Sequence, residues 1–294
     1  MTRAPLCIIT GGNTGIGFHV AKKLLETGYR VILACRSVER GEAAVKDLSE
    51  SAKDPSLIEF MHLDLNDRNS IKSFVDGFIS KKLPLNLLIN NAAVYNSTIK
   101  PLTEEKIDQT LYINFYGLVY LTCLLLTTIK QSYPARVVNV NSSLYKNASL
   151  DLDQAVLDPC EHYGLTPANC YPISKLRVLM ASAYISKYEL AGTYIEIVNV
   201  CPGFIPTTEL VRDSAFYKRY ILYYVFPYLS FTSTMEQGVD RVFKASTDTL
   251  TSPNSVNSPY THMYVNDSWE VVKFEDAKIK ELWNHVMELF DISD

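Results

Sequence analysis

Short apolar segments alternate with longer amphipathic segments along the chain. The short segments contain many β-branched residues and are bounded by polar or turn residues, which is typical of buried strands. These segments are "LCIIT", "RVILAC", "IEFMHLDL", "LNLLINN", "RVVNVN", "YIEIVNVC" and "THMYV". Helical periodicity lies between them, at about 15–27, 38–52, 67–81, 104–131, 171–191, 235–247 and 269–290. The alternation predicts an α/β fold: a single doubly wound domain over residues 1–294, with a parallel sheet of about seven strands and helices on both faces.

Two segments interrupt the alternation. Residues 144–169 are rich in Asp, Pro and Asn, and residues 207–234 contain many tyrosines. Both follow the carboxyl ends of predicted strands, where open α/β sheets bind their ligands. We expect 207–234 to be a lid over a lipophilic substrate; the alternative is a helix that packs in the core.

Composition narrows the classes of partner and location. The net charge of −4 argues against nucleic acid or anionic lipid as the main partner. The six cysteines show no CxxC pair and no metal-ligand spacing, so we predict reduced thiols and no metal site. The most apolar stretch, 118–129, is shorter than a bilayer span, so we expect a buried helix and no transmembrane segment.

The segment "TGGNTGIG" at residues 10–17 follows the first predicted strand and begins the first predicted helix. Glycine permits a tight turn and a close approach of the backbone to a pyrophosphate, and a helix N-terminus attracts negative charge. The alternative is a glycine cluster that only ends a strand. The position between strand and helix favours a dinucleotide site of the Rossmann type. The candidate binding residues in this loop are Gly11, Asn13, Thr14, Gly15, Ile16 and Gly17.

Tyr171, in "CYPISK", is the only one of the nineteen tyrosines with a lysine four positions later. If the segment is helical, Tyr171 and Lys175 lie on one face. A nearby ammonium favours phenolate, so we predict that Lys175 lowers the pKa of Tyr171 towards neutral pH and makes it a general acid or base. The alternative is a tyrosine packed on a helix beside a solvated lysine.

Further motifs follow in a fixed order. They are "NNAA" at 90–93, "YINFYG" at 112–117, "VVNVNSSLYK" at 137–146, the Tyr-x3-Lys pair, and Pro202–Gly203 with Thr207. Together with the glycine loop they resemble the short-chain dehydrogenase/reductase superfamily, strongly over about 1–210. "TGGNTGIG", "ILACRSVERG" and "VVNVNSSLYK" are most similar to its retinol dehydrogenase-like branch. The sequence departs from the family pattern at two positions: the family has glycine at the position of Ala93 and serine at the position of Asn141.

The resemblance implies four catalytic residues. Tyr171 would be the general acid in carbonyl reduction or the base in alcohol oxidation, and Lys175 would also hold the nicotinamide ribose. Asn114 would support a water-linked proton path to Lys175; alternatively it is a helix-kinking polar residue satisfied locally. Ser142 would hydrogen-bond the substrate oxygen. Ungapped alignment puts Asn141 and Ser142 on the family's two serines and favours Ser142, with Ser143 as the alternative.

Arg36, at the end of the second predicted strand, indicates the cofactor. An acidic residue there would bind a ribose 2′-hydroxyl, whereas arginine accommodates a 2′-phosphate, so NADP(H) is favoured. Arg40 is weaker evidence on the following helix. Asp64 resembles the family's adenine-contacting aspartate, although a helix cap nearby would explain it too. The other implied cofactor-binding residues are Asn90, which alternatively stabilises the sheet, Ala92, Tyr171, Lys175, Pro202, Gly203, Ile205 and Thr207.

The sequence thus predicts an NADP(H)-dependent oxidoreductase that transfers a hydride between nicotinamide and a lipophilic carbonyl or alcohol, such as a retinoid, a steroid or a fatty aldehyde. The alternative is a cofactor-binding sensor or scaffold protein of weak activity. We expect a monomer or a homodimer. We expect a cytoplasmic location, because relatives on the endoplasmic reticulum generally carry an N-terminal anchor that is not seen here; peripheral contact with that membrane or with a lipid droplet is the alternative.

Overall fold

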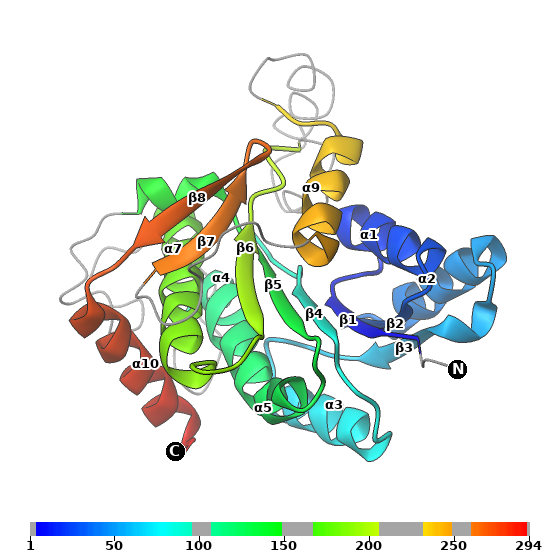
Figure 1. The fold of residues 1–294 in the computed structure, drawn as a ribbon, viewed down its shortest axis with the longest axis horizontal. Helices are drawn as coiled ribbons and strands as arrows, with labels where there is room; N and C mark the ends of the chain where they lie inside the picture. Colours follow the sequence, from blue (N-terminus) through cyan, green and yellow to red (C-terminus); the bar gives the residue numbers. More distant parts are fainter. Residues whose placement is uncertain (1–3, 96–106, 149–166, 206–231, 249–259, 293–294) are drawn as a thin grey trace.

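A single eight-stranded sheet crosses the computed structural model, which describes residues 4–95, 107–148, 167–205, 232–248 and 260–292 (Figure 1). The strand order is β3-β2-β1-β4-β5-β6-β7-β8, and the first six strands have the order of a Rossmann fold. All neighbouring pairs are parallel except β7 and β8. The strands are β1 Leu6–Thr10, β2 Arg30–Cys35, β3 Ile58–His62, β4 Leu87–Asn90, β5 Arg136–Val140, β6 Glu196–Val200, β7 Tyr260–Val265 and β8 Ser268–Lys273.

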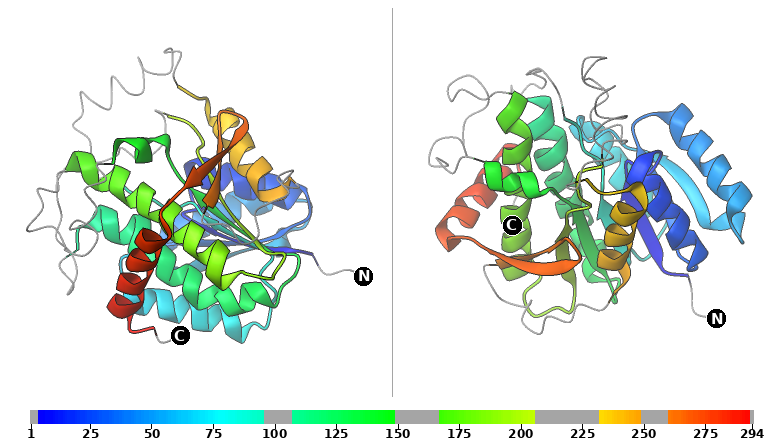
Figure 2. Two further views of the ribbon diagram at one scale, coloured as in Figure 1. Left: turned by 60° about the vertical axis from the view of Figure 1, so that its left-hand side comes forward. Right: turned by 90° about the horizontal axis from the view of Figure 1, so that it is seen from above.

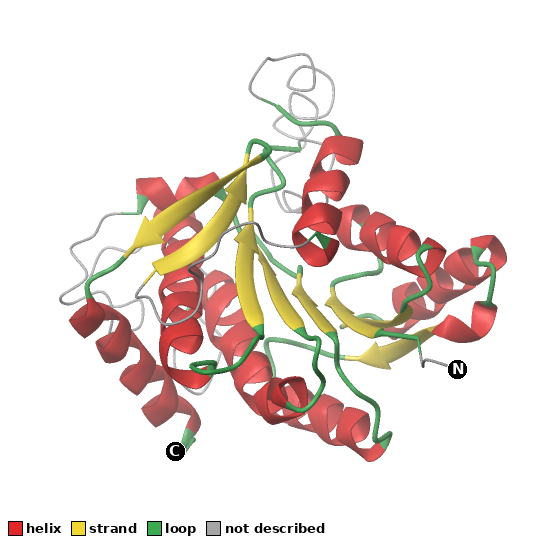
Figure 3. Ribbon diagram, viewed as in Figure 1, coloured by secondary structure: helices red, strands yellow, loops and turns green. Residues whose placement is uncertain are grey.

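Helices cover both faces of the sheet (Figures 2 and 3). One face carries α1 (Gly15–Glu26), α2 (Val38–Ser51) and α9 (Met235–Thr247). The other carries α3 (Arg68–Ser80), α5 (Leu118–Lys130) and α7 (Pro167–Tyr184), with α10 (Asp276–Phe290) packed outside α7. Shorter helical turns are Pro55–Leu57, α4 (Gln109–Leu111), Tyr112–Gly117, Ser143–Asn147 and Ile185–Glu189. The predicted doubly wound α/β fold is confirmed.

Each central strand is apolar on both sides because both sides are buried. Ile8 of β1 belongs to the core on the side of α3, α5 and α7, whereas its neighbour Ile9 belongs to the core on the side of α1, α2 and α9. Side chains alternate between the faces of a strand, so a strand covered by helices on both sides reads as a continuous apolar run. This explains why the sequence pattern located the strands well.

The prediction of a helix over 269–290 is wrong in its first part. Residues 268–273 form β8, which pairs antiparallel with β7 as an edge strand. The two strands are joined at Asn266 and Asp267, both with positive φ (48° and 62°). Two consecutive left-handed residues are the geometry of a tight hairpin, which Asn and Asp tolerate. The helical periodicity belongs to α10 alone, and the hairpin raises the strand number to eight.

The chain has one helical segment, among the described residues, that is long and apolar enough to cross a membrane. It comprises Gln109–Lys130, and 78% of its most apolar window is buried inside the fold. It lies against the sheet beside α3 and α7, as the core helix of a globular domain does. The expected buried helix at 118–129 is therefore observed.

Candidate active site

The glycine turn between β1 and α1 lies at the carboxyl edge of the sheet. Gly11 and Gly15 have positive φ (64° and 57°), which L-residues with side chains rarely adopt. Gly17 is required for a different reason: a Cβ there would lie 2.5 Å from the Asn91 side-chain nitrogen and 2.8 Å from the Gly11 carbonyl oxygen. A Cβ on Gly15 would meet no atom within 4 Å, so the outer side of the turn is open.

The first turn of α1 is suited to an anion. Thr14, its N-cap residue, makes no side-chain capping bond, and no acidic residue lies in this first turn. The first backbone N–H groups of a helix have no partner within the helix, and the helix dipole adds positive potential there. Asn13, Thr14 and Ile16 form this partly exposed surface. The residues present therefore fit the pyrophosphate of a dinucleotide.

Asn91, which the sequence prediction passed over, ties the glycine turn to β4. Its side-chain nitrogen donates to the carbonyl oxygens of Thr10 (2.9 Å) and Gly11 (3.2 Å). The Thr10 hydroxyl in turn accepts from the backbone N–H groups of Asn91 and Ala92, both at 3.0 Å. Ala92 is thereby placed beside Gly11, as expected of a residue that lines the cleft. The sequence signal that could have identified Asn91 is its position as the second asparagine of "NNAA".

The Asn90 side chain makes contacts of the kind expected if it stabilises the sheet, and cofactor binding by Asn90 stays a prediction. Its side chain is buried and donates to the Asn139 side-chain oxygen (2.8 Å) and the Thr122 hydroxyl (3.1 Å). Asn139 is the register partner of Asn90 on β5, and Thr122 lies on α5. The amide therefore joins the sheet to a covering helix and faces away from the glycine turn.

Tyr171 and Lys175 lie on α7, both buried, with relative exposures of 5% and 2%. The Lys175 Nζ is 5.6 Å from the centre of the Tyr171 ring and donates a 2.9 Å hydrogen bond to the Val140 carbonyl oxygen. The Ser142 side chain lies close enough to the Tyr171 hydroxyl to lower its pKa as a hydrogen-bonding group. Ser142 directly follows β5 and begins the helical turn 143–147. The structure thus brings together all three groups, as the sequence predicted.

The predicted direction of the Tyr171 pKa shift is wrong for this structure. Burial raises the pKa of Tyr171, the nearby Cys201 thiol acts in the same direction, and the hydrogen bond with Ser142 only partly offsets them. Burial also lowers the pKa of Lys175 to about 8. A desolvated phenolate is costly, and in this structure burial outweighs the effect of neighbouring groups. The i, i+4 spacing predicted the proximity but not the burial.

Ser142 and Ser143 are clearly distinguished by their surroundings. The Ser142 hydroxyl accepts from the Leu144 N–H (3.2 Å), which leaves its own proton available to Tyr171 or to a substrate oxygen. Ser143 is exposed, and its N–H points to the Cys201 sulfur at 3.4 Å. The geometry supports the choice of Ser142.

Asn114 lies in the wide helical turn Tyr112–Gly117, between α4 and α5. Its side chain accepts from the Val94 N–H (2.8 Å) and donates to the Val94 carbonyl oxygen (2.9 Å) and to the Ser174 hydroxyl (3.3 Å). Ser174 precedes Lys175 in α7. Asn114 therefore joins the segment after β4 to α7, and its proton-path role remains a prediction. Such π-type turns often occur at functional sites.

The expected adenosine-side residues lie at the ends of β2 and β3. Arg36 is exposed directly after β2, whose Ala34 carbonyl oxygen accepts from the Gly11 N–H at 2.8 Å. Arg40 is exposed in the first turn of α2. The Asp64 carboxylate accepts from the Asn66 N–H (2.9 Å) in a turn, and Asp67 is the actual N-cap of α3.

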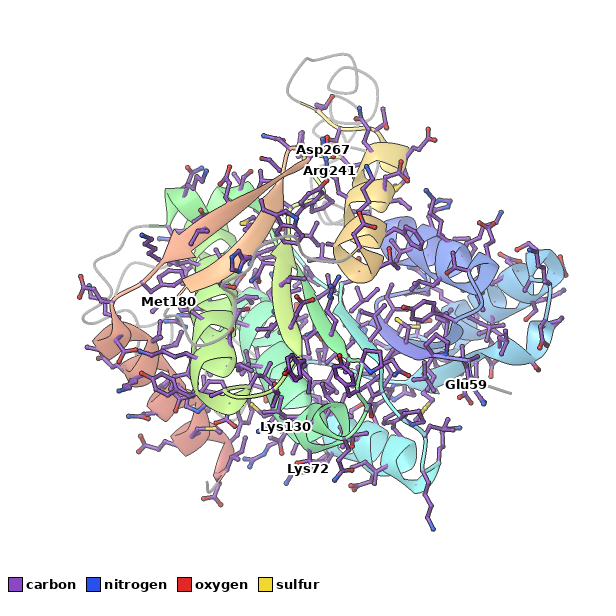
Figure 4. The ribbon with its side chains drawn as sticks, viewed as in Figure 1. Glu59, Lys72, Lys130, Met180, Arg241 and Asp267 are labelled. Carbon is purple, nitrogen blue, oxygen red and sulfur yellow. The ribbon has the colours of Figure 1, made fainter. Side chains whose placement is uncertain are left out.

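The loop after β6 begins with Pro202, Gly203 and Ile205. Gly203 has a φ of 92°, and a Cβ there would lie 2.1 Å from the Ser233 hydroxyl. Arg241, which the sequence prediction missed, holds this loop: its Nη1 donates to the Pro202 carbonyl oxygen at 3.0 Å. Its guanidinium also pairs with Asp267 at 3.4 Å, and Figure 4 shows the two residues together beside the β7–β8 hairpin. Thr207, and the proposed lid 207–234 apart from its last three residues, lie outside the described residues.

Two side chains beside Tyr171 carried no sequence signal. The Tyr95 ring lies 5.3 Å from the Tyr171 ring in an edge-on arrangement, and the buried Cys201 lies close enough to influence the pKa of Tyr171. Leu144 and Phe204 are partly exposed on the loops after β5 and β6, with exposures of 40% and 39%. Tyr171 therefore has an aromatic neighbour, and the loops after β5 and β6 each expose one apolar side chain.

A doubly wound sheet, a glycine turn at its first helix and a Ser–Tyr–Lys group at the same edge are the arrangement of a dinucleotide-binding dehydrogenase. The family model described as short chain dehydrogenase matches residues 6–151. Retinol dehydrogenase 11 of Homo sapiens is 33% identical over 231 residues, which are 79% of this chain and 69% of that protein. The chain belongs to the short chain dehydrogenase family, in its retinol dehydrogenase-like branch.

Other similarities agree with this assignment. Retinol dehydrogenase 12 of Bos taurus is 36% identical over 207 residues, which are 70% of this chain and 63% of that protein. The match thus spans slightly less than two thirds of that relative. A crystal structure of an uncharacterized protein from Mycobacterium paratuberculosis has a TM-score of 0.71 and 23% identity, and the match covers 98% of this chain and 93% of that chain. It shows that the fold is shared.

Proposed function

We propose that this chain is an NADP(H)-dependent oxidoreductase that interconverts a lipophilic alcohol and its aldehyde or ketone. The observation that carries the proposal is the convergence of Ser142, Tyr171 and Lys175 at the sheet edge that also bears the open glycine turn. A bound nicotinamide would supply or accept the hydride. The chain's own residues would bind and orient the substrate and transfer the proton.

In carbonyl reduction, the Tyr171 hydroxyl donates its proton to the substrate oxygen. The raised pKa of Tyr171 keeps this proton in place near neutral pH, so the phenol is in the protonated form that donation requires. The Ser142 hydroxyl contacts the same oxygen and stabilises the negative charge that develops on it. Lys175, fixed by the Val140 carbonyl oxygen, keeps a positive charge within reach of the phenol at pH values below about 8.

The preference for NADP(H) over NAD(H) rests on Arg36. This guanidinium is exposed next to the end of β2, with no acidic residue between Arg30 and Arg36 to bind a free ribose hydroxyl. Arginine recognises phosphate by charge and by paired N–H donors.

The lipophilic substrate is inferred from two observations. The Tyr95 ring lies beside the Tyr171 ring, and Leu144 and Phe204 are exposed apolar residues on the loops that follow β5 and β6. Several of the similar proteins are named retinol dehydrogenases, and retinol is a long apolar alcohol. A retinoid, steroid or fatty aldehyde fits this description.

The test is a panel of aldehydes, ketones and alcohols followed by the absorbance of NADPH. We expect turnover with long apolar members and little with short polar ones. The rival proposal is a cofactor-binding sensor or scaffold. Measurable NADPH binding without turnover of any panel member would favour that rival.

A further inference from the structure

Asn141 is a buried amide placed between the catalytic serine and the catalytic lysine. It follows β5, has a relative exposure of 2%, and its backbone N–H donates to the Val200 carbonyl oxygen at 2.7 Å. Its backbone therefore extends the pairing of β5 with β6 by one residue. The side chain occupies the position that is a serine in the family pattern.

The Asn141 side chain makes three hydrogen bonds. Its oxygen accepts from the Ser142 N–H at 2.8 Å. Its nitrogen donates to the Lys175 carbonyl oxygen at 3.1 Å and to the Asn199 side-chain oxygen at 3.4 Å. A serine hydroxyl has one proton and a shorter reach, so it cannot donate to two acceptors and accept from Ser142 at once.

A second bond runs in the opposite direction between the same two segments. The Lys175 ammonium donates to the Val140 carbonyl oxygen, while the Asn141 amide donates to the Lys175 carbonyl oxygen. The end of β5 and the catalytic turn of α7 are therefore joined by two reciprocal bonds. We call this pair of bonds the β5–α7 clamp.

Asn199, the third hydrogen-bond partner of the Asn141 side chain, is also held in place. Asn199, on β6, accepts from the Ser182 hydroxyl at 3.3 Å and donates to the Thr261 hydroxyl at 2.8 Å. These groups are buried, and an unpaired polar group there would be destabilising. Asn141 has little freedom to adopt another orientation.

We propose that Asn141 is a positioning residue, which holds the Ser142 backbone and the Lys175 turn so that the Ser142 hydroxyl meets the Tyr171 hydroxyl. Its catalytic consequence rests on the proposed function, but the positioning itself does not. Asn141 acts only through its neighbours and does not touch the reacting atoms.

The experiment compares Asn141→Ala with a matched control, Asn139→Ala. Asn139 lies on the same strand and is equally buried, and its side chain bonds Asn90 and Ser182 without contacting Ser142 or Lys175. Both variants should lose thermal stability. Only Asn141→Ala should speed amide hydrogen exchange at Ser142, read by mass spectrometry on peptides across 140–148, because only it removes an acceptor of that N–H.

Turnover provides the second readout. Asn141→Ala should lower kcat about 10- to 100-fold, the scale of small misplacements in an active site, with the affinity for NADPH retained. Its kcat–pH profile should shift to higher pH, because a loosened Lys175 turn is less buried and the pKa of Lys175, which burial lowers to about 8, then rises. Asn139→Ala should leave the profile in place. Asn141→Ser, the residue of the family pattern, should restore only part of the kcat.

Equal exchange rates at Ser142 in wild type and Asn141→Ala would overturn the inference, and so would equal losses of kcat with unshifted profiles in both alanine variants. An enzyme without turnover on any substrate defeats the proposed function instead. In that case the exchange comparison still decides whether Asn141 positions Ser142.

Discussion

Ser142 and Tyr171 lie beside each other, although one follows β5 and the other lies on α7, and the Ser142 side chain lowers the pKa of the Tyr171 phenol. The same two elements are joined a second time, because Lys175 of α7 is anchored to the Val140 carbonyl oxygen at the end of β5. In the proposed mechanism both hydroxyls contact the substrate oxygen. Each part of this arrangement can be tested separately.

Removing the Tyr171 hydroxyl removes the proposed proton donor. Tyr171→Phe should reduce kcat about 10²- to 10⁴-fold, the usual contribution of general acid–base catalysis, while NADPH binding measured by fluorescence stays near wild type. The change keeps the ring that packs against Tyr95, so folding should persist. Undiminished turnover would refute the catalytic role of Tyr171.

The two adjacent serines form a natural matched pair. Ser142→Ala should lower kcat about 10²- to 10³-fold, because it removes a hydrogen bond to the developing oxyanion. Ser143→Ala should remain near wild type, because this side chain is exposed and only its N–H is engaged. Steady-state kinetics on both variants would decide the assignment, and the reverse order of effects would transfer the role to Ser143.

The lowered pKa of Lys175 should appear in the pH dependence of stability. The folded chain loses the Lys175 proton at about pH 8, whereas an unfolded lysine keeps it to about 10.4. Between these values the unfolded state binds more protons, so this group makes folding more favourable as pH rises.

The measurement is the difference in Tm between wild type and Lys175→Met from pH 7 to 10. Cysteines and tyrosines also titrate at alkaline pH, but their contributions to Tm are common to both proteins and cancel in the difference. The Tm of wild type should rise relative to the Tm of Lys175→Met as the pH increases across this range. A constant difference would mean that burial does not shift the pKa of Lys175 in the folded protein.

Arg36 should determine the choice of cofactor. Arg36→Leu should lower kcat/KM with NADPH about 10- to 100-fold, since a hydrogen bond to a charged group contributes about 1.5–3 kcal/mol, and should change kcat/KM with NADH little. Arg40→Leu, four positions later and also exposed, is the control and should have the smaller effect. A wild type that prefers NADH would contradict the proposed specificity.

Phe290 anchors the last helix to the domain. Its ring stacks on Tyr120 of α5 with centroids 4.2 Å apart, and it is only 1% exposed. Phe290→Ala should lower the free energy of unfolding by about 3–5 kcal/mol, measured by urea titration. Val271→Ala on the edge strand, where the side chain is 50% exposed, should cost no more than about 0.5 kcal/mol. A small effect at Phe290 would mean that α10 contributes little to the core.

Local pattern determined much of this protein. The β-branched runs located the parallel strands, because strands buried on both faces are apolar throughout, and the glycine spacing located the turn at the start of α1. The spacing of Tyr171 and Lys175 predicted their proximity, because one helical turn separates them.

Only the tertiary structure decided what depends on burial and on contacts between distant elements. It showed that burial raises the pKa of Tyr171, that Asn90 supports the sheet while Asn91 holds the glycine turn, and that Arg241 secures the loop after β6. It also divided 269–290 into a strand and a helix. Desolvation and hydrogen-bond partners are set by how strands and helices pack, and a periodicity confined to one segment contains no information about them.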